Sequence, residues 1–130
     1  MKAIDTSLVV RYIVRDHAEQ ANAARQALFG GVFVPITVLQ ETAWVLASYY
    51  RQPRSEIAEN LLDILDMPNV VVARESAVRW ALTQFSTKGD IADLLHIVAA
   101  AECDSILTFD RRMVRHAGPD SPIPVELLTS

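Results

Sequence analysis

The chain has 130 residues, of which 51% are hydrophobic and 22% are charged, and its net charge is −4. These values predict one folded domain over residues 1–130. They argue against a disordered chain and against a basic protein that holds nucleic acid by bulk electrostatics. No apolar run reaches the roughly 18 residues of a membrane span, and Asp5 interrupts any apolar leader. The lone Cys103 cannot form an internal disulfide, so we expect a cytoplasmic protein. We expect Cys103 itself to be a buried helix residue, because no His motif accompanies it.

Strand and helix patterns alternate along the first half of the chain. Gly30 and Gly31 are typical of a left-handed helix end, Pro35 closes a strand, and Thr37 with Gln40 has the spacing of a capping box. In chain order, the expected elements are a strand at Lys2–Ile4, helices at about Thr6–Val14 and Ala18–Phe29, a strand at residues 32–34, and helices at Thr37–Tyr50 and Ser55–Leu65.

The alternation continues in the second half. The expected elements are a strand at Val70–Val72, helices at Glu75–Phe85 and Asp90–Glu102, a strand at Ser105–Phe109, a short basic helix at Arg111–His116, and an extended segment framed by Pro122 and Pro124 that reaches Val125. Short β-branched strands joined by helices predict a parallel sheet with helices on both faces. Ligands of such sheets bind beyond the carboxyl ends of the strands.

Four carboxylates stand in otherwise apolar stretches: Asp5, Glu41, Asp93 and Asp110. Asp5 and Asp110 each follow a strand, and Glu41 lies in the first turns of the helix after the second strand, so we expect the acids to converge at one edge of the sheet. Three of them also have a structural explanation. Asp5 and Asp110 fit helix N-caps, and Asp93 fits a first-turn acid three residues after Asp90.

Glu41 fits that structural explanation worst. Its helical neighbours three and four residues away are Thr37, Val38, Trp44 and Val45, and a charge is costly to bury on such a face. No Lys or Arg lies within one helical turn, which leaves a long-range ion pair as the alternative to a functional role.

Converging carboxylates need a counter-charge. Two of them about 5 Å apart repel by roughly 3 kcal/mol at an effective dielectric of 20, and a cluster takes up protons unless a cation neutralises it. Mg²⁺ or Mn²⁺ does so with oxygen ligands alone, whereas His17, His96 and His116 are too scattered for zinc spacing. Because such an ion polarises a phosphoryl oxygen, the pattern indicates hydrolysis of phosphodiesters.

Several short strings follow one another along almost the whole chain: Ile4-Asp5-Thr6-Ser7, Glu41 with Trp44-Val45-Leu46, Pro53-Arg54-Ser55-Glu56-Ile57, Gly89-Asp90-Ile91-Ala92-Asp93-Leu94-Leu95-His96 and Thr108-Phe109-Asp110-Arg111. In their order and spacing the chain resembles the PIN-domain ribonucleases and, more narrowly, the VapC toxins of bacterial toxin–antitoxin pairs. The resemblance implies a three-layer α/β/α sandwich with a central parallel sheet, and an endoribonuclease that depends on Mg²⁺ or Mn²⁺. It also implies a homodimer, joined into a heterotetramer or larger complex by a small VapB-like antitoxin that inserts a peptide into the active cleft.

The same resemblance assigns roles by position. Asp5, Glu41, Asp93 and Asp110 match the acidic quartet that binds metal and catalyses, and Asp90 matches an extra acid that binds metal directly or through water. Further matches are the hydroxyl residues Thr6, Ser7 and Thr108, which we expect to hold the carboxylates in place. Arg111 and Arg112 follow Asp110 directly and are the candidates for RNA contact.

Two alternatives to a toxin remain open at this point. One is a housekeeping RNA-processing nuclease of the same family, and the other is a non-catalytic module whose acids recognise a basic partner. A phosphotransfer domain is disfavoured, because no second acid lies beside Asp5 and no Lys follows Lys88.

Overall fold

The computed structural model describes residues 1–129, which form an α/β fold with seven helices and five short strands. The strands are β1 (Lys2–Ala3), β2 (Val32–Phe33), β3 (Val70–Val71), β4 (Ile106–Thr108) and β5 (Val125–Leu127). The helices are α1 (Thr6–Val14), α2 (Ala18–Gly30), α3 (Ile36–Ser48), α4 (Arg54–Leu65), α5 (Glu75–Phe85), α6 (Ile91–Ala99) and α7 (Arg111–Ala117). None of these helices is long and apolar enough to cross a membrane.

All strand pairs are parallel, as the alternation of elements predicts, and the α/β sandwich class is confirmed. The strands divide into two sheets, however, rather than forming one continuous central sheet. One sheet has the order β1-β2-β3 and the other pairs β4 with β5. The β1 strand contributes only two residues, both exposed, so few hydrogen bonds and little buried surface are available there to hold β4 against it.

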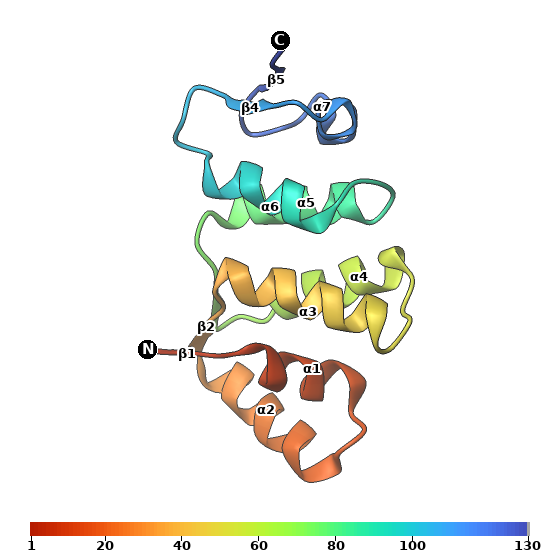
Figure 1. Ribbon diagram of the computed structural model, residues 1–130. Coiled ribbons are helices and arrows are strands. Elements are labelled where there is room, and N and C mark those ends of the chain that lie inside the picture. The colour runs from red at the N-terminus through yellow and green to blue at the C-terminus, as the bar shows by residue number, and fades with distance from the viewer. Residues whose placement is uncertain (130) are drawn as a thin grey trace.

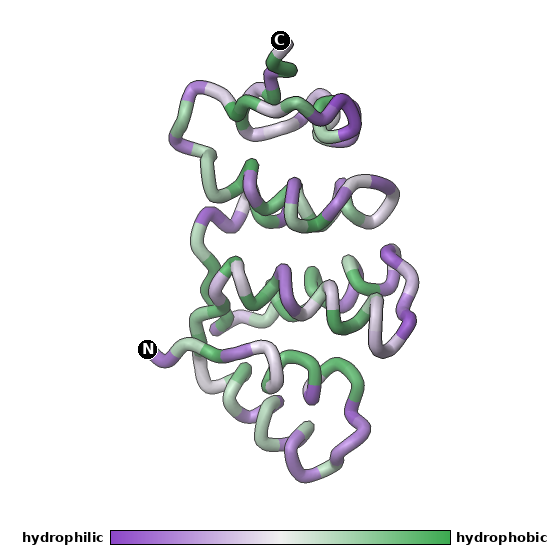
Figure 2. Tube along the Cα trace, in the orientation of Figure 1, coloured by the Kyte–Doolittle hydropathy of each residue, from purple (hydrophilic) through white to green (hydrophobic). Residues whose placement is uncertain are grey.

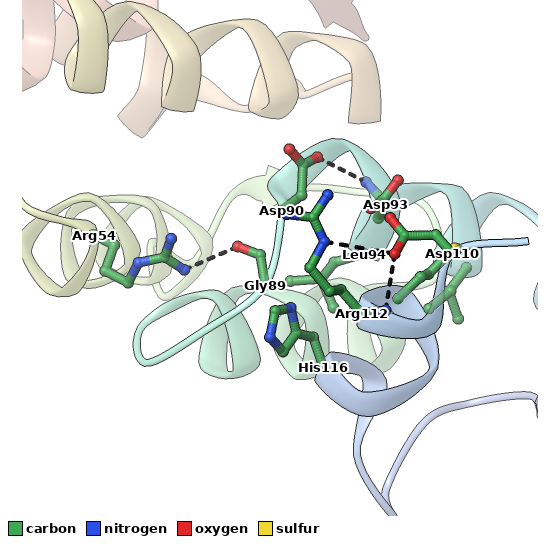
Figure 3. A pocket seen from close by; sticks show the side chains of 10 residues that line it. Arg54, Gly89, Asp90, Asp93, Leu94, Asp110, Arg112 and His116 are labelled. Atoms are coloured by element: carbon green, nitrogen blue, oxygen red, sulfur yellow. Dashed lines mark hydrogen bonds and ion pairs between the residues drawn. The ribbon is translucent and has the colours of Figure 1, made fainter.

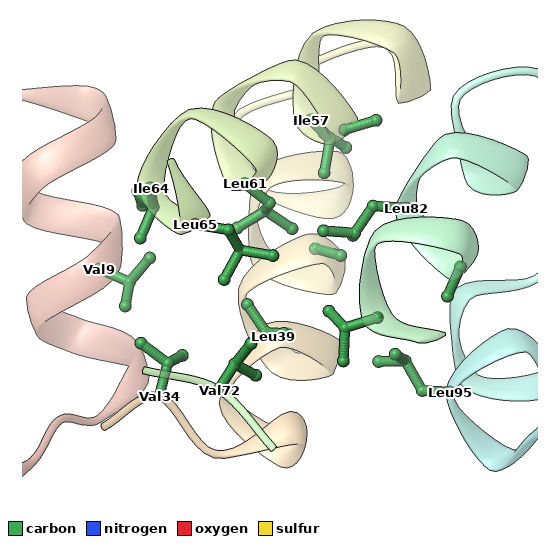
Figure 4. Packing of buried hydrophobic residues seen from close by; sticks show 14 of the residues in the cluster. Val9, Val34, Leu39, Ile57, Leu61, Ile64, Leu65, Val72, Leu82 and Leu95 are labelled. Carbon is green, nitrogen blue, oxygen red and sulfur yellow. The ribbon is translucent and has the colours of Figure 1, made fainter. Parts of the chain in front are cut away.

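The helix pairs α1–α2, α3–α4 and α5–α6 follow one another along the molecule, and α7 lies with β4 and β5 at the far end (Figure 1). Hydrophilic residues mark the α1–α2 and α3–α4 connections (Figure 2). The main core lies between the helices, where Val9 of α1, Leu39 of α3, Leu61 of α4 and Leu82 of α5 are fully buried in one cluster (Figure 4). Burial of such side chains contributes about 1.5–3 kcal/mol each.

A smaller apolar cluster holds the C-terminal elements. Ile97 of α6 packs there with Met113 and Ala117 of α7 and with Ile123. Trp80 of α5 is partly buried against both clusters and so connects the C-terminal layer to the main core.

The predicted capping box at Thr37 is wrong. Helix α3 begins one residue earlier, with Pro35 as its N-cap and no side-chain cap hydrogen bond. The ring of Pro35 fixes φ at −62°, and its carbonyl oxygen accepts hydrogen bonds from the N–H groups of Val38 and Leu39. Thr37 therefore lies inside the first turn, where its hydroxyl cannot cap the helix.

The last apolar helix is also shorter than predicted. Helix α6 ends at Ala99, where the N–H of Ala100 reaches the carbonyls of both His96 and Ile97 in a tightened last turn. Cys103 lies in the turn beyond it and is exposed, so its predicted buried helical position is wrong. The final extended segment runs past Val125 to Leu127, because β5 pairs with β4 along its whole length.

Candidate metal centre

Three acids from the second half of the chain line one hollow of about 420 Å³, which we call the acidic hollow. Asp90 is the N-cap of α6, Asp93 lies in the first turn of the same helix, and Asp110 is the N-cap of α7 (Figure 3). The Oδ1 atom of Asp90 accepts a 3.1 Å hydrogen bond from the N–H of Asp93. The hollow falls within the size range of ordinary ligand sites, roughly 300–1,000 Å³.

Asp93 is the acid in this hollow whose charge the protein stabilises least. Burial raises its pKa above the usual value, and the negative charges of Asp90 and Asp110 raise it further, against opposing effects of His96 and Arg112. Its carboxylate is partly buried, and the charges of two other acids act on it. A bound cation would relieve this excess of negative charge.

Asp110 is held differently. Its Oδ1 atom accepts a 2.8 Å hydrogen bond from the N–H of Arg112, whose Nε lies 3.6 Å from the same oxygen. These contacts, with the backbone bond first, lower the pKa of Asp110 and keep it ionised. The hydroxyl of Thr108 accepts a hydrogen bond from the N–H of Asp110 and so fixes its backbone, rather than donating to the carboxylate as expected.

Two acids from the first half of the chain line a second hollow, which we call the α1 hollow. Asp5 is the N-cap of α1, and its Oδ1 accepts a 2.7 Å hydrogen bond from the hydroxyl of Ser7 and a 3.2 Å bond from the N–H of Leu8. The Ser7 hydroxyl is the largest cause of the lowered pKa of Asp5, and the Leu8 amide is the next. Across the hollow, the hydroxyl of Thr6 donates to the carboxylate of Glu41 on α3.

Glu41 is exposed, so the burial cost expected from its apolar neighbours does not arise. Two of those neighbours are themselves open to solvent, since Thr37 is exposed and the Trp44 side chain is 66% exposed, while Val38 and Val45 are half-buried. The partner of Glu41 is a hydroxyl from α1 and not a distant arginine. A third hollow, which we call the α3 hollow, is lined by Glu41, Gln40 and Trp44 from α3 and by Asp90 from the start of α6.

The quartet is therefore divided. Asp5 and Glu41 lie together, Asp93 and Asp110 lie together with Asp90, and Glu41 and Asp90 share the α3 hollow. Within residues 1–129, no three His, Cys, Asp or Glu side chains are close enough to hold one ion. The donor chemistry nevertheless fits a hard divalent cation, because the groups are all carboxylates, and burial together with the charges of Asp90 and Asp110 raises the pKa of Asp93.

Six residues that line the acidic hollow are not identified from the sequence as site residues: Arg54, Gly89, Leu94, Ile97, Met113 and His116. Arg54, Gly89 and His116 line it beside the acids (Figure 3). Arg54 reaches the hollow from the start of α4, and its hydrogen-bond partners lie 31 and 35 residues along the chain, so no local spacing announces it. Gly89, by contrast, precedes Asp90 directly, and a glycine before a helix N-cap is a usable signal of a special backbone angle.

The two arginines expected to contact RNA point to different places. Arg112 lines the acidic hollow and pairs with Asp110. Arg111 lies instead beside Phe109 and Leu128, on the outside of the C-terminal layer. Of the two, Arg112 is the one placed next to the acids.

Searches among curated proteins and among solved structures gave no match to the chain. The family model described as PIN domain matches residues 2–119, which include all five acids and both hollows around them. PIN domains are generally nucleases, act on RNA or DNA, and typically use divalent metal ions. The chain belongs to the PIN domain family.

Proposed function

We propose that this chain is an endoribonuclease that depends on Mg²⁺ or Mn²⁺, built as a single PIN domain over residues 1–130 and active in the cytoplasm. The observation that carries the proposal is the acidic hollow, where burial and the charges of Asp90 and Asp110 together raise the pKa of Asp93. A cluster of carboxylates in this state gains more from a divalent cation than an isolated surface acid does.

Each acid has a part in the proposal. Asp93 and Asp110 would hold the ion with Asp90 once their carboxylates draw closer together than they lie in the structure, and Asp5 and Glu41 would complete its surroundings from the α1 hollow. The two groups must approach one another for this, and Glu41 and Asp90 already share the α3 hollow. When bound, the ion polarises a phosphoryl oxygen and lowers the pKa of its water. Hydrolysis then breaks the bond from phosphorus to the 3′ oxygen, leaving a 3′-hydroxyl and a 5′-phosphate.

The other side chains hold these groups in place. Ser7 fixes one oxygen of Asp5, and Thr6 fixes Glu41. Arg112 pairs with Asp110 and would also contact a substrate phosphate in this proposal. Cleavage of an end-labelled RNA by the purified chain should stop in EDTA and return with excess Mn²⁺. Equal cleavage in EDTA would rule out the metal-dependent reaction.

An activity test needs a control for contaminating nucleases. Asp93→Asn removes the charge while keeping the hydrogen bond that the Asp93 N–H donates to Asp90, and it should abolish cleavage. Asp63→Asn, at an exposed position of α4, should cleave as the natural chain does. If both variants retain full activity, the cleavage does not come from this site.

We further propose that the nuclease is the VapC-type toxin of a type II toxin–antitoxin pair. Its inhibitor would be a small VapB-like antitoxin, and the toxin would be a homodimer that forms a heterotetramer or larger complex with it. The motif order described above supports this, and so does the α3 hollow, where the exposed ring of Trp44 lies beside Glu41 and Asp90. An apolar ring next to acids suits a peptide that carries both apolar and basic residues.

The genomic neighbourhood offers a direct test of the toxin role. A small upstream open reading frame for a DNA-binding protein should be present, and its product should bind the chain and stop cleavage. Growth arrest on induced expression, relieved by that product, is the expected phenotype. If expression has no effect on growth and no such neighbour exists, a housekeeping RNA-processing nuclease is the better assignment. Tight partner binding without any metal binding would favour the non-catalytic module.

A further inference from the structure

Arg54 bridges two parts of the chain that are far apart in sequence. It is the first residue of α4, and its Nη1 atom donates hydrogen bonds to the carbonyl oxygen of Phe85, at 3.1 Å, and to that of Gly89, at 2.9 Å. Figure 3 shows the bond to Gly89. The guanidinium carbon also lies 4.9 Å from the centre of the Phe85 ring. Two carbonyls and one aromatic face therefore fix the direction of this side chain.

The segment that Arg54 holds is the loop that leads into the acids. Gly89 is buried and has a φ of +97°, and a Cβ at this position would lie 3.2 Å from Cδ1 of Leu94. The next residue, Asp90, caps α6 by accepting a hydrogen bond from the N–H of Asp93. The conformation at Gly89 thus decides where the Asp90 carboxylate points and where α6 starts.

Arg54 does not act on the acids directly. Among the described residues, the ion pairs of arginines with acids involve Arg11, Arg74, Arg79 and Arg112, and none involves Arg54. Its contacts are with backbone oxygens, at the end of α5 and at the residue before the α6 cap. The hydrogen bonds of Arg54 therefore act on the acids through the position of the backbone.

We propose that Arg54 is a positioning residue for the acidic hollow: by holding the carbonyls of Phe85 and Gly89, it fixes the turn that places Asp90 and Asp93 for metal binding. The inference rests on the proposed function only for the identity of the ligand. The hydrogen bonds and the stacking contact of Arg54 do not depend on the proposed function. Residues that orient metal ligands in this way typically change metal affinity about 10- to 100-fold when they are removed.

The test compares Arg54→Ala with Arg79→Ala. Arg79 is a matched control, because it also links α4 to α5, through Asp66, Glu75 and the carbonyl of Leu65, but lies outside the acidic hollow. Two readouts apply to each full-length variant: Mn²⁺ affinity by calorimetry, and hydrogen exchange of the Asp93 amide in metal-free protein. We expect Arg54→Ala to weaken Mn²⁺ binding about tenfold and to speed Asp93 exchange, while Arg79→Ala changes neither.

The possible outcomes separate the two proposals. If the natural chain binds no Mn²⁺, the proposed function fails, whereas faster Asp93 exchange in Arg54→Ala still supports the positioning role. If the natural chain binds Mn²⁺ and Arg54→Ala matches it in both readouts, the positioning role is overturned and the proposed function stands. Equal losses of Mn²⁺ affinity in Arg54→Ala and Arg79→Ala would also overturn the positioning role, since they would reflect a general loosening of the fold. Should Arg54→Ala fail to fold, Arg54→Lys keeps the charge but loses the planar fork, and a loss of Mn²⁺ affinity smaller than tenfold is expected.

Discussion

The hydroxyl of Ser7, in the first turn of the helix that Asp5 caps, donates a 2.7 Å hydrogen bond to Oδ1 of Asp5. This contact is the largest cause of the lowered pKa of Asp5. It joins the two roles that the sequence leaves open for Asp5, because the same carboxylate caps α1 and is kept ionised, as a ligand of a cation must be.

Ser7→Ala should therefore raise the pKa of Asp5, which carboxyl-resolved NMR titration measures directly. A carboxyl whose pKa is lowered in the folded state adds stability above its unfolded pKa, and this stability is lost as the pH falls through the folded pKa. The variant should thus be slightly less stable at neutral pH, by about a few tenths of a kcal/mol because solvent screens this exposed carboxylate, and the difference from the natural chain should shrink below about pH 4. Ser76→Ala, at an exposed position of α5, is the control and should leave the Asp5 titration unchanged.

Asp93→Asn should make the metal-free chain more stable. Because the folded-state pKa of Asp93 is raised, ionisation costs stability at pH values above it, and the amide avoids this cost. A gain of about 0.5 kcal/mol at neutral pH is expected from urea unfolding, and it should vanish at acid pH, where the natural carboxyl is protonated. A variant less stable than the natural chain at pH 7 would show that the repulsion from Asp90 and Asp110 is unimportant.

Gly89→Ala should destabilise the fold, because an L-residue is strained at a φ of +97° and its Cβ would crowd Leu94. The expected loss is about 1–3 kcal/mol, with weaker Mn²⁺ binding, since the same turn carries Asp90. Gly30→Ala is the matched control. It lies at the end of α2 with nothing within 4 Å of a built Cβ and should be neutral or slightly stabilising. Equal thermal stability of the two variants would contradict the strain.

Trp44→Ala should separate partner binding from folding. The ring is 66% exposed beside Glu41 and Asp90, so its removal should cost little stability and leave RNA cleavage intact. The variant should escape inhibition by the proposed antitoxin, with an affinity loss of about 2 kcal/mol or more if the ring is an anchor of the proposed interface. Inhibition assays with increasing antitoxin measure this, and unchanged inhibition would place the antitoxin elsewhere.

The order of strands and helices can be predicted from local sequence patterns. The helix ends that differ from the prediction depend on contacts between residues, which those patterns do not describe. The alternation of apolar strands and amphipathic helices predicts parallel pairing because it is a property of each segment alone. The start of α3 was misplaced because the carbonyl of Pro35 takes the place of the Thr37 hydroxyl. The division of the strands into two sheets depends on how β1 and β4 approach in space, which the two residues of β1 do not determine.

The candidate site, like the fold, can be predicted from the sequence only in part. The acids could be picked out because they interrupt apolar segments where a strand ends or a helix begins, and the structure places three of them as N-caps: Asp5, Asp90 and Asp110. Their division between two hollows, and the bridge from Arg54 to the Gly89 carbonyl, depend on packing between segments tens of residues apart. The apolar neighbours of Glu41 predict a buried carboxylate, but Glu41 is exposed. The sequence does not predict which carboxylate the Thr6 hydroxyl contacts, and in the structure it is Glu41.

The central claim is that acids from both hollows serve one metal-dependent nuclease. Its most direct test is the rate of Mn²⁺-dependent RNA cleavage by Asp5→Asn, because asparagine keeps the N-cap of α1 while removing the charge. The account predicts a folded variant of nearly natural stability whose cleavage rate falls by about 100-fold or more. A folded Asp5→Asn that cleaves RNA at the natural rate would contradict it.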